Sequence, residues 1–231
     1  MSFIVFGEEY KAKVSFPIKG KFKKGDWAPV DLSSSNKELS KDIYLSLDSF
    51  DEFIQDQKKF KNVLGLYGGY SEKRNVYQKS QVFSEGSKQR SIHLGIDFWI
   101  AAGSIVQAPI PGIIHSFKNN NQAGDYGPTL IMKHYFGNSV FYSLYGHLSQ
   151  DSLKDKKIGD QVDRKQEIGR VGEPHENVDW PPHLHFQIIK NIGDYSGDYP
   201  GVSTKKESEY YLSNCPDPLS IFGYSWKKKL S

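Results

Sequence analysis

The segment His183–Ile188 alternates two histidines and a glutamine with leucine, phenylalanine and isoleucine. Successive side chains of a β-strand point to opposite faces, so this pattern predicts a strand with one apolar and one polar face. Pro181 and Pro182 come directly before it and favour an extended backbone. The sequence therefore predicts two imidazoles on one face of a strand whose other face packs in the core.

Short runs of branched and aromatic residues, separated by turn residues, recur throughout the segment 92–189. Runs of this length and spacing are typical of an antiparallel sheet or sandwich. Residues 136–138 have the composition of a hairpin turn. We therefore predict a mainly β domain over residues 90–231, with strands at 92–99, 105–108, 112–117, 129–134, 139–145, 161–162, 168–171 and 183–189.

Residues 1–89 are predicted to be an N-terminal extension of this domain. Ser49–Glu52 has the pattern of a helix capping box, and apolar residues then recur at roughly helical spacing until Gly65. This pattern predicts one helix near residues 49–63. Residues 66–90 are rich in Gly, Tyr, Ser and Lys and are expected to cross the surface as a long connection. Three roles stay open for the extension: a structural brace, an inhibitory segment or part of a cleft.

All seven histidines lie between His93 and His185, and none lies in the first 92 residues. On a strand over 92–99, His93 and Asp97 share one face, and Gly95 between them leaves room for a metal ion. A catalytic zinc takes three ligands from His, Asp or Glu and keeps a fourth position for water. His93, Asp97 and one histidine of the pair His183 and His185 meet this requirement. Since three ligands suffice, His115, His134 and His175 are expected to be ordinary strand or loop residues.

With these residues in place, the stretch from Arg90 to Lys190 resembles the catalytic domain of the M23 zinc metallopeptidases, the lysostaphin-like and LytM-like endopeptidases. The resemblance covers under half of the chain. The motifs that carry it are His93–Asp97, Ala108–Gly112, Tyr145–Leu148, Ile168–Gly172 and Pro182–Phe186.

The resemblance implies a zinc ion bound by His93, Asp97 and His185. It implies that His183 and His147 are catalytic, one as general base and the other as a group that handles the leaving-group proton or the oxyanion. We expect His183 to be the base, although the sequence does not divide the two roles.

The chain departs from the family pattern at two places. Lys165 stands where these domains often carry a turn glycine, and no tyrosine lies close before His93, where some members place a residue that stabilises the oxyanion. Arg90 and Tyr145 are the candidates for that second role.

The expected function is hydrolysis of peptide bonds in peptidoglycan cross-links or stem peptides, by zinc-activated water with histidine acid–base catalysis. Two alternatives stay open. One is a zinc-containing binding or regulatory module without catalysis, and the other is an intracellular zinc amidohydrolase with a substrate outside the cell wall.

The composition argues against a nucleic-acid-binding, a disulfide-rich or a membrane-spanning protein. The balance of 30 Lys and Arg against 27 Asp and Glu gives a net charge of +3, which is too small to indicate nucleic-acid binding. A single cysteine excludes an intramolecular disulfide framework, and no window approaches the roughly 18 apolar residues of a membrane span. Residues 1–11 lack the features of an export signal, so we expect a cytoplasmic protein or one whose leader has been removed. The oligomeric state stays open.

Overall fold

The structure is a computed structural model that describes residues 14–79, 84–85, 88–122, 124–137 and 139–222. The side chains of residues 78–89 are not described. Residues 1–11, on which the expected absence of an export signal depends, lie outside the described part of the chain.

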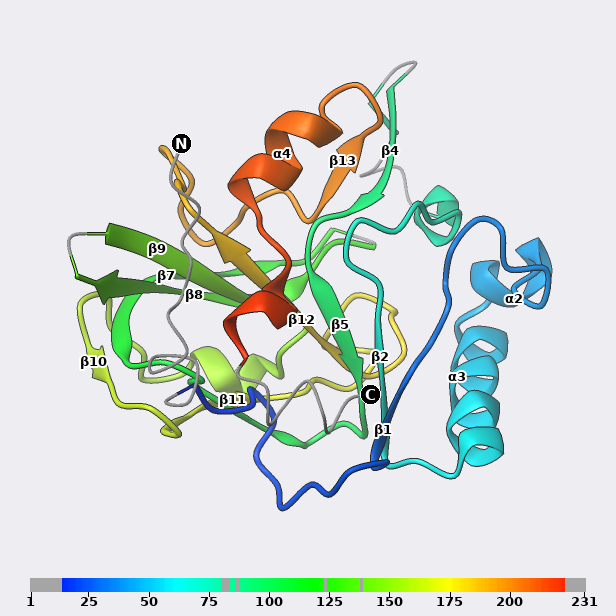
Figure 1. Cartoon of the computed structure of the whole chain (residues 1–231), viewed down its shortest axis with the longest axis horizontal. Coiled ribbons are helices and arrows are strands. Elements are labelled where there is room, and N and C mark those ends of the chain that lie inside the picture. Colours follow the sequence, from blue (N-terminus) through cyan, green and yellow to red (C-terminus); the bar gives the residue numbers. More distant parts are fainter. Residues whose placement is uncertain (1–13, 80–83, 86–87, 123, 138, 223–231) are drawn as a thin grey trace.

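An eight-stranded sheet forms the centre of the fold (Figure 1). All of its neighbouring strands pair antiparallel except β1 and β2, which pair parallel. This arrangement confirms the predicted mainly β, antiparallel fold. In spatial order the strands are β1 (Trp27–Pro29), β2 (Gly65–Gly68), β5 (Ile96–Trp99), β12 (His183–Ile189), β9 (Ser139–Gly146), β8 (Gly127–Phe136), β7 (Gly112–Asn120) and β10 (Gln161–Val162).

Two smaller sheets and several helices surround the central sheet. One small sheet pairs β6 (Ile105–Gln107) with β11 (Glu167–Arg170), and the other has the order β13 (Val202–Thr204), β4 (Lys88–His93) and β3 (Ser84–Glu85). The α-helices are α2 (Lys41–Leu45), α3 (Leu47–Lys61) and α4 (Ser208–Asn214), and short 3₁₀ turns occur at Val76–Lys79, Gln150–Leu153 and Pro218–Ile221. Within the described residues, none of these helices has the length and hydrophobicity needed to cross a bilayer.

The expected helix near 49–63 is α3, which begins and ends two residues earlier. The side chain of Ser46 caps its first turn by accepting the backbone N–H of Ser49, so the helix starts before the predicted capping box. At the other end Asn62 takes a left-handed conformation with φ of 52°, which ends the helix before Gly65. The short helix α2 directly precedes α3 (Figure 1).

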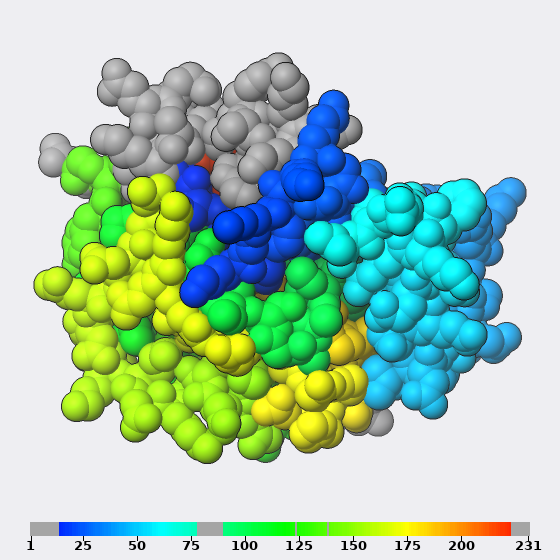
Figure 2. Space-filling model, turned by 90° about the horizontal axis from the view of Figure 1, so that it is seen from below, coloured from blue at the N-terminus to red at the C-terminus, as the bar shows by residue number. Residues whose placement is uncertain are grey.

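The N-terminal extension packs into the same core as the rest of the chain. Phe16 lies with its ring centroid 4.9 Å from that of Phe98 on β5, and Trp27 contacts the same ring at 5.7 Å. Seen from below, the blue N-terminal residues lie between the light-blue and cyan region of α3 and the green part of the chain (Figure 2).

The prediction that residues 66–90 are a surface connection is wrong for their first part. β2 lies inside the central sheet, paired with β1 on one side and with β5 on the other, and Leu66 is fully buried. Phe50 and Ile54 of α3 pack against Leu66 and Trp99 in one apolar cluster. The extension therefore adds strands and a helix next to β5, the strand that carries the predicted site residue Asp97.

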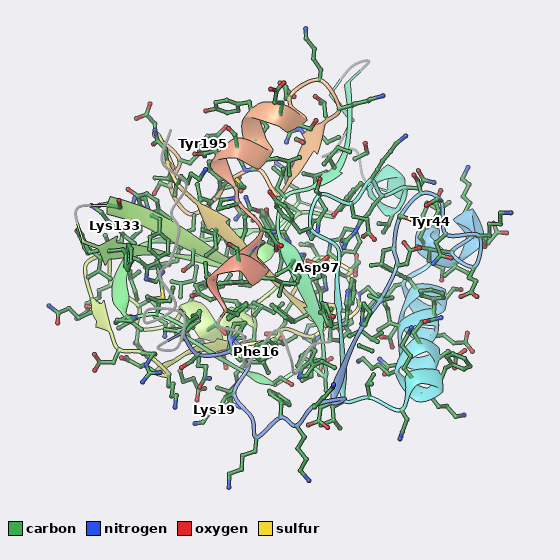
Figure 3. All side chains as sticks on the ribbon, in the orientation of Figure 1. Phe16, Lys19, Tyr44, Asp97, Lys133 and Tyr195 are labelled. Atoms are coloured by element: carbon green, nitrogen blue, oxygen red, sulfur yellow. The ribbon has the colours of Figure 1, made fainter. Side chains whose placement is uncertain are left out.

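The two faces of β5 and β12 have different characters. Ile96 and Phe98 on β5, and Leu184, Phe186 and Ile188 on β12, all belong to the main core cluster. The alternate residues therefore point to the other face, as the sequence pattern predicts. Asp97, labelled in Figure 3, is one of them and lies in the interior of the molecule.

Candidate metal centre

Strand register brings the predicted residues of β5 and β12 together. His185 lies directly opposite Asp97, and His183 lies opposite Trp99 in the same antiparallel pair. On its other side, β12 pairs with β9, where His185 faces Gly146. His147 follows Gly146 with a left-handed backbone φ of 59°, so the chain turns sharply at this residue.

His93 also lies beside Asp97 and His185, but it lies on a different strand from Asp97, which was not expected. The predicted continuous strand over 92–99 is interrupted between β4 and β5, and His93 ends a strand that pairs with Val202 of β13. Leu94 correspondingly packs in another apolar cluster than Ile96. The change of direction occurs because the two halves of this segment join different sheets.

Gly95, at this interruption, allows His185 to approach closely. A Cβ atom on residue 95 would lie 2.6 Å from both Cε1 and Nε2 of the His185 ring. No side chain fits in that space without moving the imidazole. Gly95 was expected to leave room for a metal ion, whereas in the structure the space that it leaves is taken by the imidazole of His185.

Three potential ligand atoms form a compact triangle. His93 Nε2 and His185 Nδ1 are 3.0 Å apart, His185 Nδ1 and Asp97 Oδ1 are 3.0 Å apart, and His93 Nε2 and Asp97 Oδ1 are 3.3 Å apart. Bonds of about 2.0–2.1 Å in a tetrahedral zinc site place two ligand atoms roughly 3.3 Å from each other. The triangle therefore has the size that a tetrahedral metal ion requires. Among the described residues, these are the only three His, Cys, Asp or Glu side chains grouped closely enough to hold a metal.

Hydrogen bonds on the outer side of both imidazoles direct their lone pairs inward. His93 Nδ1 lies 3.1 Å from the carbonyl oxygen of Gly69, and His185 Nε2 lies 3.0 Å from Oε1 of Gln187. Gln187 donates its own amide N–H to the carbonyl of Pro200 at 3.1 Å, which sets the orientation of the amide. The ring nitrogens that face these acceptors carry the protons, so His93 Nε2 and His185 Nδ1 are free to bind a cation.

Arg74 binds Asp97, the third residue of the triangle, and the sequence patterns did not identify Arg74. Its Nη1 donates to Asp97 Oδ2 at 2.6 Å, and its Nε donates to Glu72 Oε2 at 2.6 Å. Burial disfavours the charged form of Asp97, but His93 and Arg74 together keep its pKa well below the usual value. Asp97 is therefore an anion, which suits a metal ligand.

The two predicted catalytic histidines lie beside the triangle. His183 Nε2 is 4.0 Å from Asp97 Oδ1, and the His183 Nδ1–H points to the carbonyl of Pro181 at 2.8 Å. The imidazole of His183 stacks on Trp99 at 4.1 Å between centroids, and the ring of His147 lies at the same distance on another side. Burial lowers the pKa of His183 to about 4, so this ring is neutral at pH 7.

The pKa of His147 also falls well below its usual value. Burial is the main cause, followed by the neighbouring His183 and His185. Both histidines beside the triangle are thus neutral imidazoles that can accept a proton.

A cavity of about 260 Å³ opens next to these groups. The N-terminal extension contributes Leu32, Phe50, Arg74, Val76 and Tyr77 to its wall, and the β-rich part contributes the five predicted site residues. Side chains of residues 1–89 therefore form part of the wall of this cavity.

The two candidates for oxyanion stabilisation, Arg90 and Tyr145, lie in different places in the structure. Arg90 lines the cavity, whereas Tyr145 is fully buried in the main core, with its hydroxyl accepting a hydrogen bond from Ser143. Tyr145 therefore cannot reach a substrate. Tyr77 and Tyr126 line the cavity instead. Neither follows from a local motif, because both are brought in by connections between strands.

The remaining histidines lie away from the triangle. His134 is buried and lies 2.6 Å from the hydroxyl of Ser143, His115 contacts the ring of Tyr142, and His175 is exposed. Lys165, which stands where a turn glycine was expected, adopts a left-handed φ of 69°. The turn thus keeps the backbone shape that favours glycine although its residue is lysine.

The sequence of this chain is similar to those of known peptidases. Residues 91–196 match the family model for peptidase family M23. A protein of Buchnera aphidicola subsp. Baizongia pistaciae, named uncharacterized metalloprotease, is 31% identical over 106 residues, which are 46% of this chain and 25% of that protein. A Haemophilus influenzae protein with the same name is 28% identical over 126 residues, 52% of this chain and 24% of that protein. The chain thus spans only about a quarter of each of these two relatives.

Solved structures with similar chains include a putative peptidase M23 from Pseudomonas aeruginosa, with 26% identity and a TM-score of 0.38 over 59% of this chain and 48% of that chain. A zinc containing peptidase from Vibrio cholerae shows 27% identity and a TM-score of 0.35 over 53% of this chain and 33% of that chain. The catalytic domain of lysostaphin from Staphylococcus simulans shows 22% identity and a TM-score of 0.42 over 70% of this chain and 96% of that chain.

Proposed function

The chain belongs to peptidase family M23 through residues 91–196, and from this premise we propose that it is a zinc-dependent metalloendopeptidase. The observation that carries the proposal is the triangle of His93 Nε2, Asp97 Oδ1 and His185 Nδ1 beside two further histidines at one cavity. The proposed substrate is a peptide bond in peptidoglycan, in a cross-link or a stem peptide. This finer part of the proposal rests on the family resemblance.

His93, Asp97 and His185 are the proposed zinc ligands, because two imidazoles and one carboxylate make up a donor set that zinc accepts in catalytic sites. A bound zinc ion would act as a Lewis acid that lowers the pKa of water toward about 7 and polarises a substrate carbonyl. The inward lone pairs of the two imidazoles, and the ionised state of Asp97, support this assignment.

His183 is the proposed general base. Its Nδ1–H is held by the carbonyl of Pro181, so the lone pair of Nε2 faces the side of Asp97 and can accept a proton from the attacking water. Stacking on Trp99 keeps the imidazole in this orientation. A base that is neutral at pH 7 meets the protonation requirement of this step.

His147 is the proposed partner of His183. Its ring centroid lies 4.1 Å from that of His183, and both rings line the cavity. From this position the imidazole of His147 can deliver a proton to the leaving amine or stabilise the developing oxyanion.

The test incubates zinc-loaded protein with purified peptidoglycan and with glycine-rich peptides, and detects new amino termini by mass spectrometry. We expect cleavage that a chelator abolishes and added zinc restores. His183→Ala protein that retains zinc is the control for contaminating peptidases, since it should leave the substrates intact.

The other outcomes separate the alternatives. Stoichiometric zinc without cleavage of any peptidoglycan or glycine-rich peptide contradicts the peptidase proposal and favours a binding or regulatory module. Cleavage of soluble amides only, with native protein found in the cytoplasmic fraction, favours an amidohydrolase whose substrate lies outside the wall.

A further inference from the structure

Arg74 connects the metal centre to the N-terminal extension through two carboxylates. The side chain is 3% exposed, with Nη1 2.6 Å from Asp97 Oδ2 and Nε 2.6 Å from Glu72 Oε2. Asp97 Oδ1, the other oxygen of the same carboxylate, lies 3.0 Å from His185 Nδ1. The guanidinium therefore binds only the oxygen of Asp97 that points away from the ligand triangle.

Glu72 is itself held in place, so it can hold Arg74. Its Oε1 accepts the backbone N–H of Leu32 at 3.1 Å, while Oε2 accepts from Arg74. The negative charge of Glu72 also balances the positive charge of the buried guanidinium. Arg74 is thus oriented by a carboxylate that is not part of the triangle.

The backbone of the same segment is tied to the strand that ends in His93. Ser71 N–H donates to the carbonyl of His93, His93 N–H donates to Glu72, and Arg74 N–H donates to Ser91, at 2.8–3.0 Å. Gly69, two residues before Ser71, accepts from His93 Nδ1. One short segment of the extension therefore contacts two of the three members of the triangle.

We propose that Arg74 is a positioning residue that makes Asp97 a one-oxygen metal ligand. By occupying Oδ2, the guanidinium leaves only Oδ1 for the ion and prevents the carboxylate from rotating to offer both oxygens. Glu72 in turn holds Arg74 in this position. The metal centre then includes residues 69–74 of the extension as an orienting layer. This inference rests on the proposed metal site and identifies what orients its carboxylate.

A positioning role and simple charge repulsion predict opposite changes in zinc affinity when Arg74 is removed. A guanidinium close to the site repels a divalent cation, so removing its charge alone would tighten zinc binding. Loss of a group that orients a ligating carboxylate instead weakens metal binding, typically by about 10–100-fold. The direction of the change in zinc affinity therefore separates the two effects.

The experiment measures the zinc dissociation constant by competition with a chromophoric chelator for the wild type, Arg74→Met, Arg74→Lys and the double variant Arg74→Met/Glu72→Gln. The double variant removes one positive and one negative charge, so it keeps the net charge of the site. Arg170→Met is the matched control, because Arg170 forms an Arg–carboxylate pair with Glu167 at 3.0 Å on the surface.

We expect zinc binding to weaken by about 10–100-fold in Arg74→Met and in the double variant, and by less in Arg74→Lys, whose single ammonium cannot reproduce the two-sided contact. The visible spectrum of the cobalt-substituted protein gives a second readout. Its intensity should fall in both Met-containing variants as Asp97 offers both oxygens and the coordination number rises. A purely structural role of Arg74 would lower the melting temperature without changing this spectrum.

Unchanged or tighter zinc binding in Arg74→Met and in the double variant, or an equal loss in Arg170→Met, overturns the inference. If Arg74→Met fails to fold, Arg74→Lys and the double variant decide by the same criteria. A wild type that binds zinc tightly but cleaves no peptide contradicts the proposed function and leaves the positioning role standing. A wild type that binds no zinc contradicts both.

Discussion

His185 Nδ1 lies 3.0 Å from Asp97 Oδ1 because the two residues face each other across the antiparallel strands β12 and β5. A register slip of one residue would turn either side chain to the opposite face of the sheet. The apolar residues that alternate with Asp97 on β5 and with His185 on β12 prevent such a slip, because they fill the main core on the other face of the sheet. The placement of Asp97 opposite His185 in the candidate metal centre is therefore a consequence of core packing.

Replacing a ligand should remove the metal without unfolding the chain. We expect His185→Ala to lose bound zinc, measured by elemental analysis after dialysis, because two remaining ligands do not make a stable site. His175→Ala is the control, since His175 is exposed and outside the triangle. Equal zinc content in the two variants would contradict the ligand assignment.

Gly95→Ala should damage the same site through sterics alone. The added methyl would lie 2.6 Å from the His185 ring, so the imidazole must move out of the triangle. We expect weaker zinc affinity and a loss of about 1–3 kcal/mol in the free energy of unfolding, measured by denaturant titration. Wild-type zinc affinity in this variant would show that the ring is not held as described.

Phe50 on α3 should matter for both stability and turnover. Its ring lies 5.5 Å from Trp99, which in turn stacks on His183. We expect Phe50→Ala to lose about 3–5 kcal/mol of unfolding free energy and to reduce peptide turnover while keeping zinc. Phe60→Ala is the matched control on the same helix, because Phe60 is 87% exposed and should change neither quantity. Similar effects of both substitutions would contradict a specific role for the cavity wall.

Asp125 should make stability depend on pH. Burial, followed by the nearby Asp198, raises the pKa of Asp125 from 3.8 to about 6. The unfolded chain ionises this carboxyl at lower pH than the folded protein, so its contribution to stability falls as the pH rises from about 4 to about 6. The uncharged Asp125→Asn variant should therefore melt at a higher temperature than the wild type at pH 7 and show no such gain near pH 4. A gain of the same size at both pH values would contradict charge as the cause.

Local patterns in the sequence contain enough information for most strands of the β-rich part and for the candidate residues on β5 and β12. The alternation in His183–Ile188 predicts the polar face on which both histidines lie, and the structure confirms the direction of each side chain. The antiparallel pairing of β8 with β9 at Phe136 and Ser139 and the helix near 49–63 also follow from local chemistry, while Asn138 of the predicted turn lies outside the described residues. Each of these features depends on residues close together in the chain.

Features that depend on distant pairing could not be predicted in this way. Arg74 and Asp97 are 23 residues apart, and no periodic pattern marks Arg74 as a buried side chain. The interruption after His93 arises because β4 pairs with β13, more than 100 residues later in the chain. The short strand β2 carries too few residues to show an alternation, so its place in the central sheet depends on its neighbours.

The most direct test of the central claim compares zinc content and peptide turnover in the wild type, Asp97→Ala and His183→Ala. The account predicts that Asp97→Ala loses both zinc and turnover. It predicts that His183→Ala keeps zinc but loses turnover by a factor of about 10²–10⁴, the usual contribution of a general base. Full peptidase activity in zinc-free Asp97→Ala protein would contradict it.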